Sequence, residues 1–201
     1  MSKETDPTKG KRTRSMIMDS AYTLFLEQGF HGTSMRQVAQ RAGLAVSGIY
    51  NHFPSKEALF GAILLDKHPY KQILPLLINV PGQSIEEYVQ NSARALIDEL
   101  GSHPDLIKLM FIEIVEFNGK NLPKFFETIQ PTIVPLLERF GCSKDRLRQI
   151  APTVLLRAFM GLFFSYYIVE QSLEGNHQSA LGEIAFNDLV DIYLHGILIK
   201  E

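Results

Sequence analysis

A short run of small and hydrogen-bonding residues between Val46 and Phe53 could read the edges of DNA base pairs. If this run is helical, Ser47, Gly48, Asn51 and His52 fall on one side. A helix face inserted into the major groove needs little bulk, so that the backbone comes close, and an amide that can pair bidentately with adenine. The run therefore predicts a reading helix whose packed side carries Ile49, Tyr50 and Phe53.

The residues before this run predict a second short helix and a tight turn. Ser34 and Gln37 have the spacing of a capping box, which starts a helix. Gly43 lies where a helix that must turn sharply favours a residue with positive φ. Between them, apolar residues form one stripe at helical spacing, and polar residues occupy the other side. The stripe consists of Met35, Val38, Ala39 and Ala42. Two such helices in succession indicate a helix-turn-helix DNA-binding motif.

The same region resembles the amino-terminal signature of the TetR family of transcriptional regulators. The resemblance is carried by Thr33-Ser34-Met35, Val38-Ala39, Ala42-Gly43-Leu44, Ile49-Tyr50, His52-Phe53, Ser55-Lys56 and Leu59. It covers about a quarter of the chain. One position departs from the family pattern, because Ala45 stands where the family usually has Ser or Thr. The reading helix therefore lacks a side-chain cap, which costs roughly 0.5–2 kcal/mol of helix stability.

The resemblance implies roles in DNA binding for eight residues. By this resemblance, the phosphate contacts are Thr33, Tyr50, His52 and Lys56. The residues that approach base edges are Arg36, Ser47, Gly48 and Asn51. For Lys56 the reason is also local, since a lysine at the start of a helix can reach a phosphate beside the free backbone N–H groups there.

Charge divides the chain unevenly. The whole chain has a net charge of −2, yet its first 60 residues hold eight basic and five acidic residues. A basic end followed by an acidic body is compatible with a nucleic-acid partner. We therefore expect a flexible arm over residues 1–10, a DNA-binding domain over 11–55 and a helical effector-binding and dimerisation domain over 56–201. In the arm and its continuation, the candidate phosphate contacts are Lys9, Lys11, Arg12 and Arg14.

The fold class predicted is all-α, with three helices in the DNA-binding domain and a larger helical domain after it. Apolar residues at helical spacing before the motif predict a first helix that Gly29 closes. No convincing run of alternating strand residues follows Phe53. A fourth helix is expected from Lys56 to Pro69. Further helices are expected near residues 69–79, 84–102, 104–118, 123–140, 144–170 and 179–199. Pro131, Pro135 and Pro152 would kink or interrupt the helices that contain them.

The last two expected helices are apolar on nearly every side, so they must be buried on nearly every side. Pairing with the same helices of a second copy would achieve this, as in the four-helix interface of proteins resembling this family. Gly161 and Ser165 could allow close approach. A homodimer would also place two reading helices one DNA turn apart, about 34–36 Å, on a palindromic operator. The alternative is an ordinary core within one chain.

The resemblance also implies an unidentified small-molecule effector, largely apolar, that binds in the body of the protein. An apolar cavity with a few polar groups is the usual character of such a site. The candidate lining residues are Met110, Glu113, Phe117, Phe126, Phe163, Tyr166 and Tyr167. Aromatic residues at helical spacing also occur as plain core.

Other classes of function lack support in the sequence. No glycine-rich phosphate loop, nucleophile elbow or metal-ligand spacing is present, so we expect no enzyme, cofactor or metal site. The stretch Ala151–Val169 approaches membrane-spanning length but contains Arg157 and Pro152, so a buried interface helix is the better account. The single Cys142 fits the reducing cytoplasm. The sequence thus predicts a cytoplasmic one-component regulator, a repressor that its ligand releases from DNA. The alternative is a helical ligand-binding or assembly module whose DNA reader is degenerate.

Overall fold

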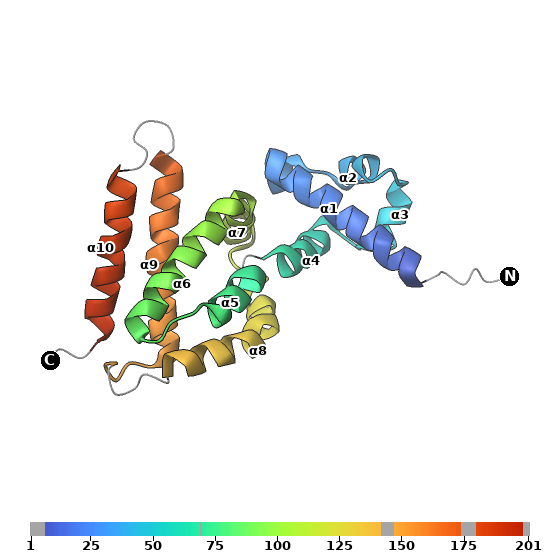
Figure 1. The fold of residues 1–201 in the computed structure, drawn as a ribbon. Coiled ribbons are helices and arrows are strands. Elements are labelled where there is room, and N and C mark those ends of the chain that lie inside the picture. The colour runs from blue at the N-terminus through green and yellow to red at the C-terminus, as the bar shows by residue number, and fades with distance from the viewer. Residues whose placement is uncertain (1–6, 69, 142–146, 174–179, 199–201) are drawn as a thin grey trace. The chain divides into compact units, whose positions relative to one another are not determined.

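A computed structural model of the chain describes residues 7–68, 70–141, 147–173 and 180–198. The described residues form helices and no β-strand, apart from one isolated bridge between Leu147 and Leu198 (Figure 1). This confirms the predicted all-α fold class. The helices are α1 (Pro7–Gly32), α2 (Met35–Arg41), α3 (Val46–Tyr50), α4 (Lys56–Lys67), α5 (Tyr70–Asn79), α6 (Ile85–Ser102), α7 (Pro104–Phe117), α8 (Leu122–Gly141), α9 (Pro152–Leu173) and α10 (Ala180–Ile197).

The chain divides into two compact units, each with its own core. The amino-terminal unit comprises residues 1–68 and 105–128, and the carboxy-terminal unit comprises 69–104 and 129–201. Helix α4, most of α7 and the start of α8 therefore share a unit with the helix-turn-helix. Helix α1 already begins at Pro7, so residues 7–10 of the expected arm are helical, while residues 1–6 lie outside the described part. The boundaries predicted at residues 11 and 56 stay a prediction.

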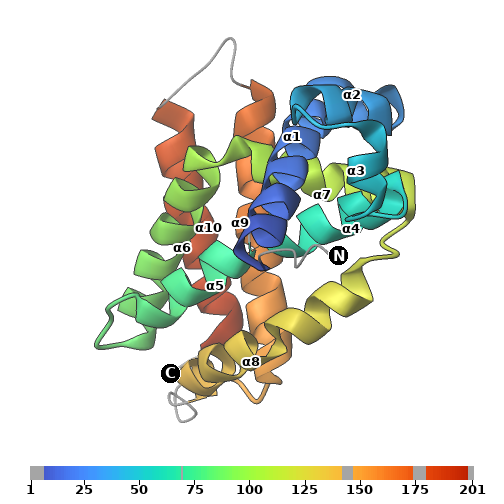
Figure 2. The same cartoon turned by 90° about the vertical axis from the view of Figure 1, so that its right-hand side faces the viewer.

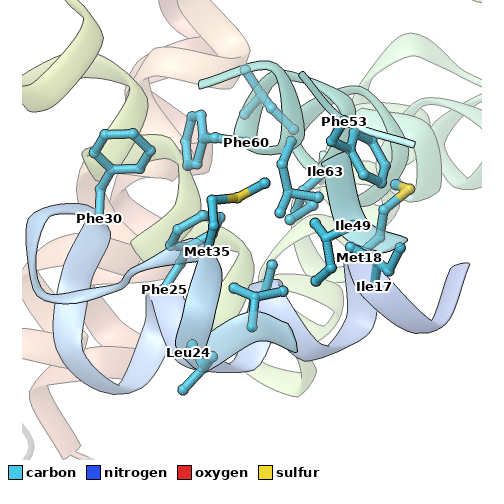
Figure 3. Close-up of a cluster of buried hydrophobic side chains, with 14 of the residues drawn as sticks. Ile17, Met18, Leu24, Phe25, Phe30, Met35, Ile49, Phe53, Phe60 and Ile63 are labelled. Carbon is cyan, nitrogen blue, oxygen red and sulfur yellow. The ribbon is translucent and has the colours of Figure 1, made fainter. Parts of the chain in front are cut away.

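Apolar side chains from α1, α2, α3 and α4 point toward one another in the core of the amino-terminal unit (Figure 3). Phe60 lies at the centre of an aromatic cluster, with the ring centroids of Phe25 and Phe30 each 5.7 Å away. From α7, Phe117 stacks on Phe60 with a centroid separation of 4.6 Å and an angle of 12° between the ring planes. This stack explains why α7 packs with the amino-terminal helices although the two rings are 57 positions apart in sequence. The buried members from α1 to α4 include Ile17, Phe25, Val38, Ile49, Phe53 and Ile63.

In the carboxy-terminal unit, α9 and α10 run side by side and α6 packs against both (Figures 1 and 2). Two tyrosines join pairs of helices in this unit by donating hydrogen bonds from buried hydroxyls to carbonyl oxygens. Tyr193 of α10 donates to Leu155 of α9 at 2.9 Å, and Tyr88 of α6 donates to Leu77 of α5 at 3.0 Å. Burial raises the pKa of the Tyr193 hydroxyl well above its usual value, so this donor stays protonated.

Helix α9 begins at Pro152, so the predicted helix start near residue 144 is wrong. The sequence predicts that Pro152 kinks or interrupts that helix, and Pro152 instead marks the point where the helix starts. Proline is favoured at the first helical position, because its missing N–H has no helical partner there in any case. The residues before it run beside the end of α10, where Arg148 donates from its backbone N–H to Ile197 and from its guanidinium to Gly196, each at 2.8 Å. Pro131 and Pro135 do lie inside α8, as expected.

Candidate nucleic-acid interface

The capping box predicted for α2 is confirmed. The hydroxyl of Ser34 accepts a hydrogen bond from the N–H of Gln37 at 3.2 Å, and the Gln37 side chain accepts one from the N–H of Ser34 at 2.7 Å. The turn after α2 contains Gly43 at φ +66°, a conformation that costs most other residues energy. The sequence therefore fixes both ends of α2 locally.

The reading helix α3 is shorter than predicted, because it ends at Tyr50 rather than at Phe53. Its core side is formed by Ile49 and Phe53, which are both buried. Tyr50 is 51% exposed, so the prediction that it packs on this side is wrong. After the helix, the N–H groups of His52 and Phe53 both donate to the Ile49 carbonyl at 2.9 Å, which holds the chain close to the end of α3.

Ala45 occupies the N-cap of α3 in an extended conformation and makes no side-chain capping bond. We expect Ala45→Ser to stabilise the protein by about 0.5–2 kcal/mol, because a serine hydroxyl at this position can accept a bond from a free N–H of the first turn. Urea unfolding followed by circular dichroism measures the change. Ala45→Val adds bulk but no acceptor and is the matched control. Equal effects of the two substitutions would contradict the capping explanation.

Six of the eight predicted DNA contacts are accessible in the free protein. Arg36, Ser47, Tyr50 and Asn51 are exposed, and Gly48 and His52 are half-buried. Arg36 makes no ion pair with any described residue. The other arginine of α2 behaves differently, because two nitrogens of Arg41 contact the Glu27 carboxylate at 2.9 and 3.3 Å. The structure thus leaves a polar, largely accessible surface along α2 and α3, which we call the reading face: Arg36, Ser47, Gly48, Tyr50, Asn51 and His52.

The two remaining predicted contacts, Thr33 and Lys56, bond within the chain. Thr33 is buried, and its hydroxyl donates to the Gly29 carbonyl at 2.9 Å and accepts from Gln28 at 3.3 Å. The Lys56 ammonium donates to the carbonyl oxygens of Phe30 and Thr33, each at 2.6 Å. It also lies 4.2 Å from the centroid of the Phe30 ring. Sequence reasoning missed Phe30, and only its position just after the helix-ending Gly29 could have suggested its role.

The first turns of α1 add positive charge to the same unit. Lys9, Lys11, Arg12 and Arg14 are all exposed. The Arg14 guanidinium lies 4.7 Å from the centroid of the Phe53 ring, so the basic end of α1 lies beside the residues that follow α3. These cations could contact phosphates next to the reading face.

The predicted effector residues fall in both units. In the amino-terminal unit, Met110 is half-buried, Phe117 stacks in the core, and Phe126 is half exposed. Glu113 is fully buried, and its carboxylate accepts hydrogen bonds from the backbone and side-chain nitrogens of Asn121 at 2.7 and 2.9 Å. In the carboxy-terminal unit, ring contacts join Phe163 and Tyr166 to Phe186, and Tyr167 is buried. Their assignment to a ligand site stays a prediction. Within the described residues, no three His, Cys, Asp or Glu side chains are grouped to hold a metal ion.

Comparison with known proteins agrees with this arrangement. Residues 17–63, which run from α1 through the helix-turn-helix into α4, match the model of the bacterial regulatory proteins of the tetR family. Over these residues the chain is therefore similar to the TetR family. That family consists of regulatory proteins and not of enzymes, which agrees with the expectation from the sequence.

Relatives of this chain include two regulators of Escherichia coli (strain K12). The HTH-type transcriptional regulator RutR is 30% identical over 123 residues, which are 54% of this chain and 53% of RutR. The HTH-type transcriptional regulator UidR is 40% identical over 58 residues, which are 29% of this chain and 30% of UidR. The chain thus matches about half the length of RutR and a smaller part of UidR.

Two solved structures share the fold over almost the whole chain. GusR of Salmonella enterica has a TM-score of 0.68 at 22% sequence identity, and the match covers 96% of this chain and 99% of GusR. NalD of Pseudomonas aeruginosa, the secondary repressor of the MexAB-OprM multidrug efflux pump, has a TM-score of 0.65 at 19% identity, with 96% and 100% covered. These likenesses extend the shared helical fold beyond residue 63.

Proposed function

We propose that this chain is a cytoplasmic one-component transcriptional repressor. In this proposal it binds a palindromic operator in double-stranded DNA as a homodimer, and a small, largely apolar molecule releases it. The observation that carries the proposal is the reading face. Its side chains are polar and accessible, while the opposite sides of α2 and α3 are buried in a well-packed core. A rigid helix that presents small and amide side chains suits the major groove.

The proposal of a homodimer is supported by apolar surface on α9 and α10 that one copy leaves open. Val154 and Val169 of α9 are 54% and 51% exposed, and Ile192 of α10 is 62% exposed. The stretch Pro152–Glu170 is by length and composition apolar enough to cross a membrane, yet only 22% of it is buried in one chain. A second copy packed on these helices would cover this surface, and two reading helices would then contact two half-sites.

The proposed repression is supported by likeness to a known repressor, and the proposed release by ligand is subject to thermodynamic linkage. The likeness to NalD, which is a repressor, supports the same sense of regulation here. A ligand can release DNA only if it binds the free conformation better than the DNA-bound one, and the coupling is reciprocal. In this proposal the ligand contacts residues among Met110, Glu113, Phe117, Phe126, Phe163, Tyr166 and Tyr167. No ion or organic cofactor takes part.

The first experiment is selection of bound sequences from a random duplex pool at a stated salt concentration, combined with sedimentation analysis of the purified protein. A recovered palindrome and a dimer mass support the proposal together. A dimer that recovers only unsorted DNA, with binding lost at physiological salt, supports the alternative of a helical ligand-binding or assembly module with a degenerate reader. A monomer that recovers a single half-site contradicts the homodimer but not sequence-specific DNA binding.

Asn51→Ala should weaken binding mainly through one base pair of each half-site. If the exposed Asn51 amide pairs bidentately with adenine, its loss relaxes discrimination at that position by roughly 1–3 kcal/mol, or about 5- to 150-fold. Competition titrations with operators mutated at single positions measure this effect. Lys124→Ala, which removes an exposed lysine from α8, is the control and should leave the sequence preference unchanged. Equal loss of affinity for operator and random DNA in Asn51→Ala would refute base reading by Asn51.

A further inference from the structure

We propose that Lys56 positions the joint between α1 and α2 and does not contact DNA phosphate. The joint comprises residues 29–34, and Lys56 reaches it from the first turn of α4. This assignment replaces the phosphate role that the family resemblance implies for Lys56. The DNA-binding test of this assignment rests on the proposed function, whereas the stability and labelling tests need no DNA.

The contacts of the Lys56 ammonium within the chain compete with binding of a phosphate. A lysine ammonium has three N–H donors and no acceptor. Two of them are used by the Phe30 and Thr33 carbonyls at 2.6 Å. The group also lies 4.2 Å from the centroid of the Phe30 ring, whose π face attracts the third side of a cation. A phosphate oxygen could bind Lys56 only by displacing one of these partners.

The joint needs a cation because of how α1 ends. Gly29 has φ +75° and ψ 173°, so the regular helix stops there. The last carbonyls of a helix lack intrahelical donors and carry partial negative charge. Thr33 supplies two donors, its hydroxyl to Gly29 and its N–H to Phe30. Lys56 adds a second donor to the Phe30 carbonyl and one to the Thr33 carbonyl just beyond α1, together with a full positive charge, which the end of a helix favours.

The position of Lys56 in its own helix supports the same assignment. It is the first residue of α4, directly after the N-cap Ser55. A cation there is disfavoured by the positive end of the α4 dipole. The compensating interaction lies outside α4, at the negative end of α1, and it bridges 26 residues of sequence to Phe30.

This bridge orients the reading helices at both ends. Thr33, whose carbonyl Lys56 binds, immediately precedes Ser34, the N-cap of α2. Lys56 itself follows α3 by six residues, close after the buried Phe53. The ammonium therefore ties the chain that enters α2 to the chain that leaves α3. Loss of the ammonium would loosen the angle at which α2 and α3 present the reading face.

The first test compares Lys56→Met with Lys124→Met in the full chain without DNA. Methionine keeps an apolar stem over Phe30 but removes the charge and all three donors. We expect Lys56→Met to lower the thermal midpoint by roughly 3–8 °C and to accelerate amide exchange in residues 30–37. Lys124 is exposed on α8, and its substitution should change neither. An unchanged midpoint and unchanged exchange in Lys56→Met would overturn the assignment.

The second test measures the affinity of Lys56→Met and of the wild-type protein for the selected operator across a series of salt concentrations. A positioning role predicts that Lys56→Met binds more weakly at every salt concentration, with the slope of log affinity against log salt unchanged. A phosphate contact predicts a slope smaller by about one per half-site. A slope reduced in that way overturns the assignment, whatever the thermal result. If the wild-type protein binds no DNA, the proposed function fails while the thermal and exchange results still decide the role of Lys56.

Labelling of the wild-type protein keeps the assignment testable if Lys56→Met does not fold. Brief acetylation followed by peptide mass spectrometry reports the reactivity of each lysine. Lys56, bonded to two carbonyls and a ring, should react several-fold more slowly than the exposed Lys124, with and without DNA. Equal reactivity of the two lysines in the free protein, or protection of Lys56 only when DNA is bound, would overturn the assignment.

Discussion

Glu113→Ala is expected to lower the free energy of unfolding by about 3–5 kcal/mol. The Glu113 carboxylate is completely buried and accepts two hydrogen bonds from Asn121, at 2.7 and 2.9 Å. Hydrogen bonds to charged groups contribute about 1.5–3 kcal/mol each, and their loss also leaves the Asn121 donors without an acceptor. Urea unfolding followed by circular dichroism, with hydrogen exchange in residues 105–128, measures the loss.

The destabilisation caused by Glu113→Ala should extend beyond α7, because Asn121 packs against α4. A Cβ atom built on Gly61 of α4 would lie 3.0 Å from the side-chain oxygen of Asn121, so the glycine permits this close approach. We expect faster amide exchange in α4 as well as in α7 of Glu113→Ala. The Glu113–Asn121 pair therefore holds the turn between α7 and α8 against the helix that follows the reading pair.

Glu116→Ala is the matched control, one helical turn away on α7. Its carboxylate contacts His31 at 2.6 Å, but the His31 side chain is 78% exposed and the Glu116 side chain 28% exposed. Exposed ion pairs contribute about 0–1 kcal/mol, because water and salt screen them. If Glu116→Ala destabilises the protein as much as Glu113→Ala, burial of the Glu113 carboxylate is not the cause. Glu113→Gln, which keeps one acceptor oxygen, should fall between the two.

Acidification should destabilise the amino-terminal unit through His68 by up to about 3 kcal/mol. This histidine is 2% exposed, and its ring stacks on Phe125 with centroids 3.7 Å apart. Burial lowers the pKa of His68 from 6.5 to about 4, because the charged imidazolium is disfavoured away from water. Urea unfolding at pH values from 4 to 8 measures the effect.

The direction of this pH dependence follows from the number of protons that the folded and unfolded states bind. Between pH 6.5 and about 4, the unfolded chain protonates His68 while the folded chain keeps it neutral. The contribution of His68 is therefore complete above pH 6.5, and stability falls as the pH decreases to about 4. His68→Phe keeps an aromatic ring against Phe125 but cannot titrate, so its unfolding free energy should decline less over this range. The same decline in both proteins would show that other groups cause it.

Local chemistry in the sequence was sufficient to predict the parts of the fold that depend on neighbouring residues. The capping box of Ser34 and Gln37 and the positive φ of Gly43 involve residues a few positions apart. The same holds for Ala45, whose missing cap is visible from its side chain alone. The apolar stripe of α2 required only helical periodicity. Consequently the helix-turn-helix and the exposed Arg36, Ser47 and Asn51 were predictable before any tertiary structure was known.

The boundaries of α9 and the exposure of Tyr50 needed more than local pattern. Pro152 is compatible with a kink inside a helix and with the first helical turn, and periodicity does not distinguish the two. In the structure Pro152 lies in the first turn, and Arg148 just before it bonds to the end of α10, almost 50 residues away. Tyr50 has the spacing of a packed residue, but α3 ends there and leaves half of its side chain exposed.

Only the tertiary structure showed which of the predicted polar site residues bond within the chain. Lys56 and Thr33 look like surface residues in sequence, but the end of α1 takes up their donors. Glu113 lies among apolar residues as a ligand-site glutamate would, yet the turn after α7 directs Asn121 back to it. The physical reason is the same in both cases. A buried carbonyl or carboxylate must be satisfied, and the partner that satisfies it is set by distance in space, which residue spacing does not encode.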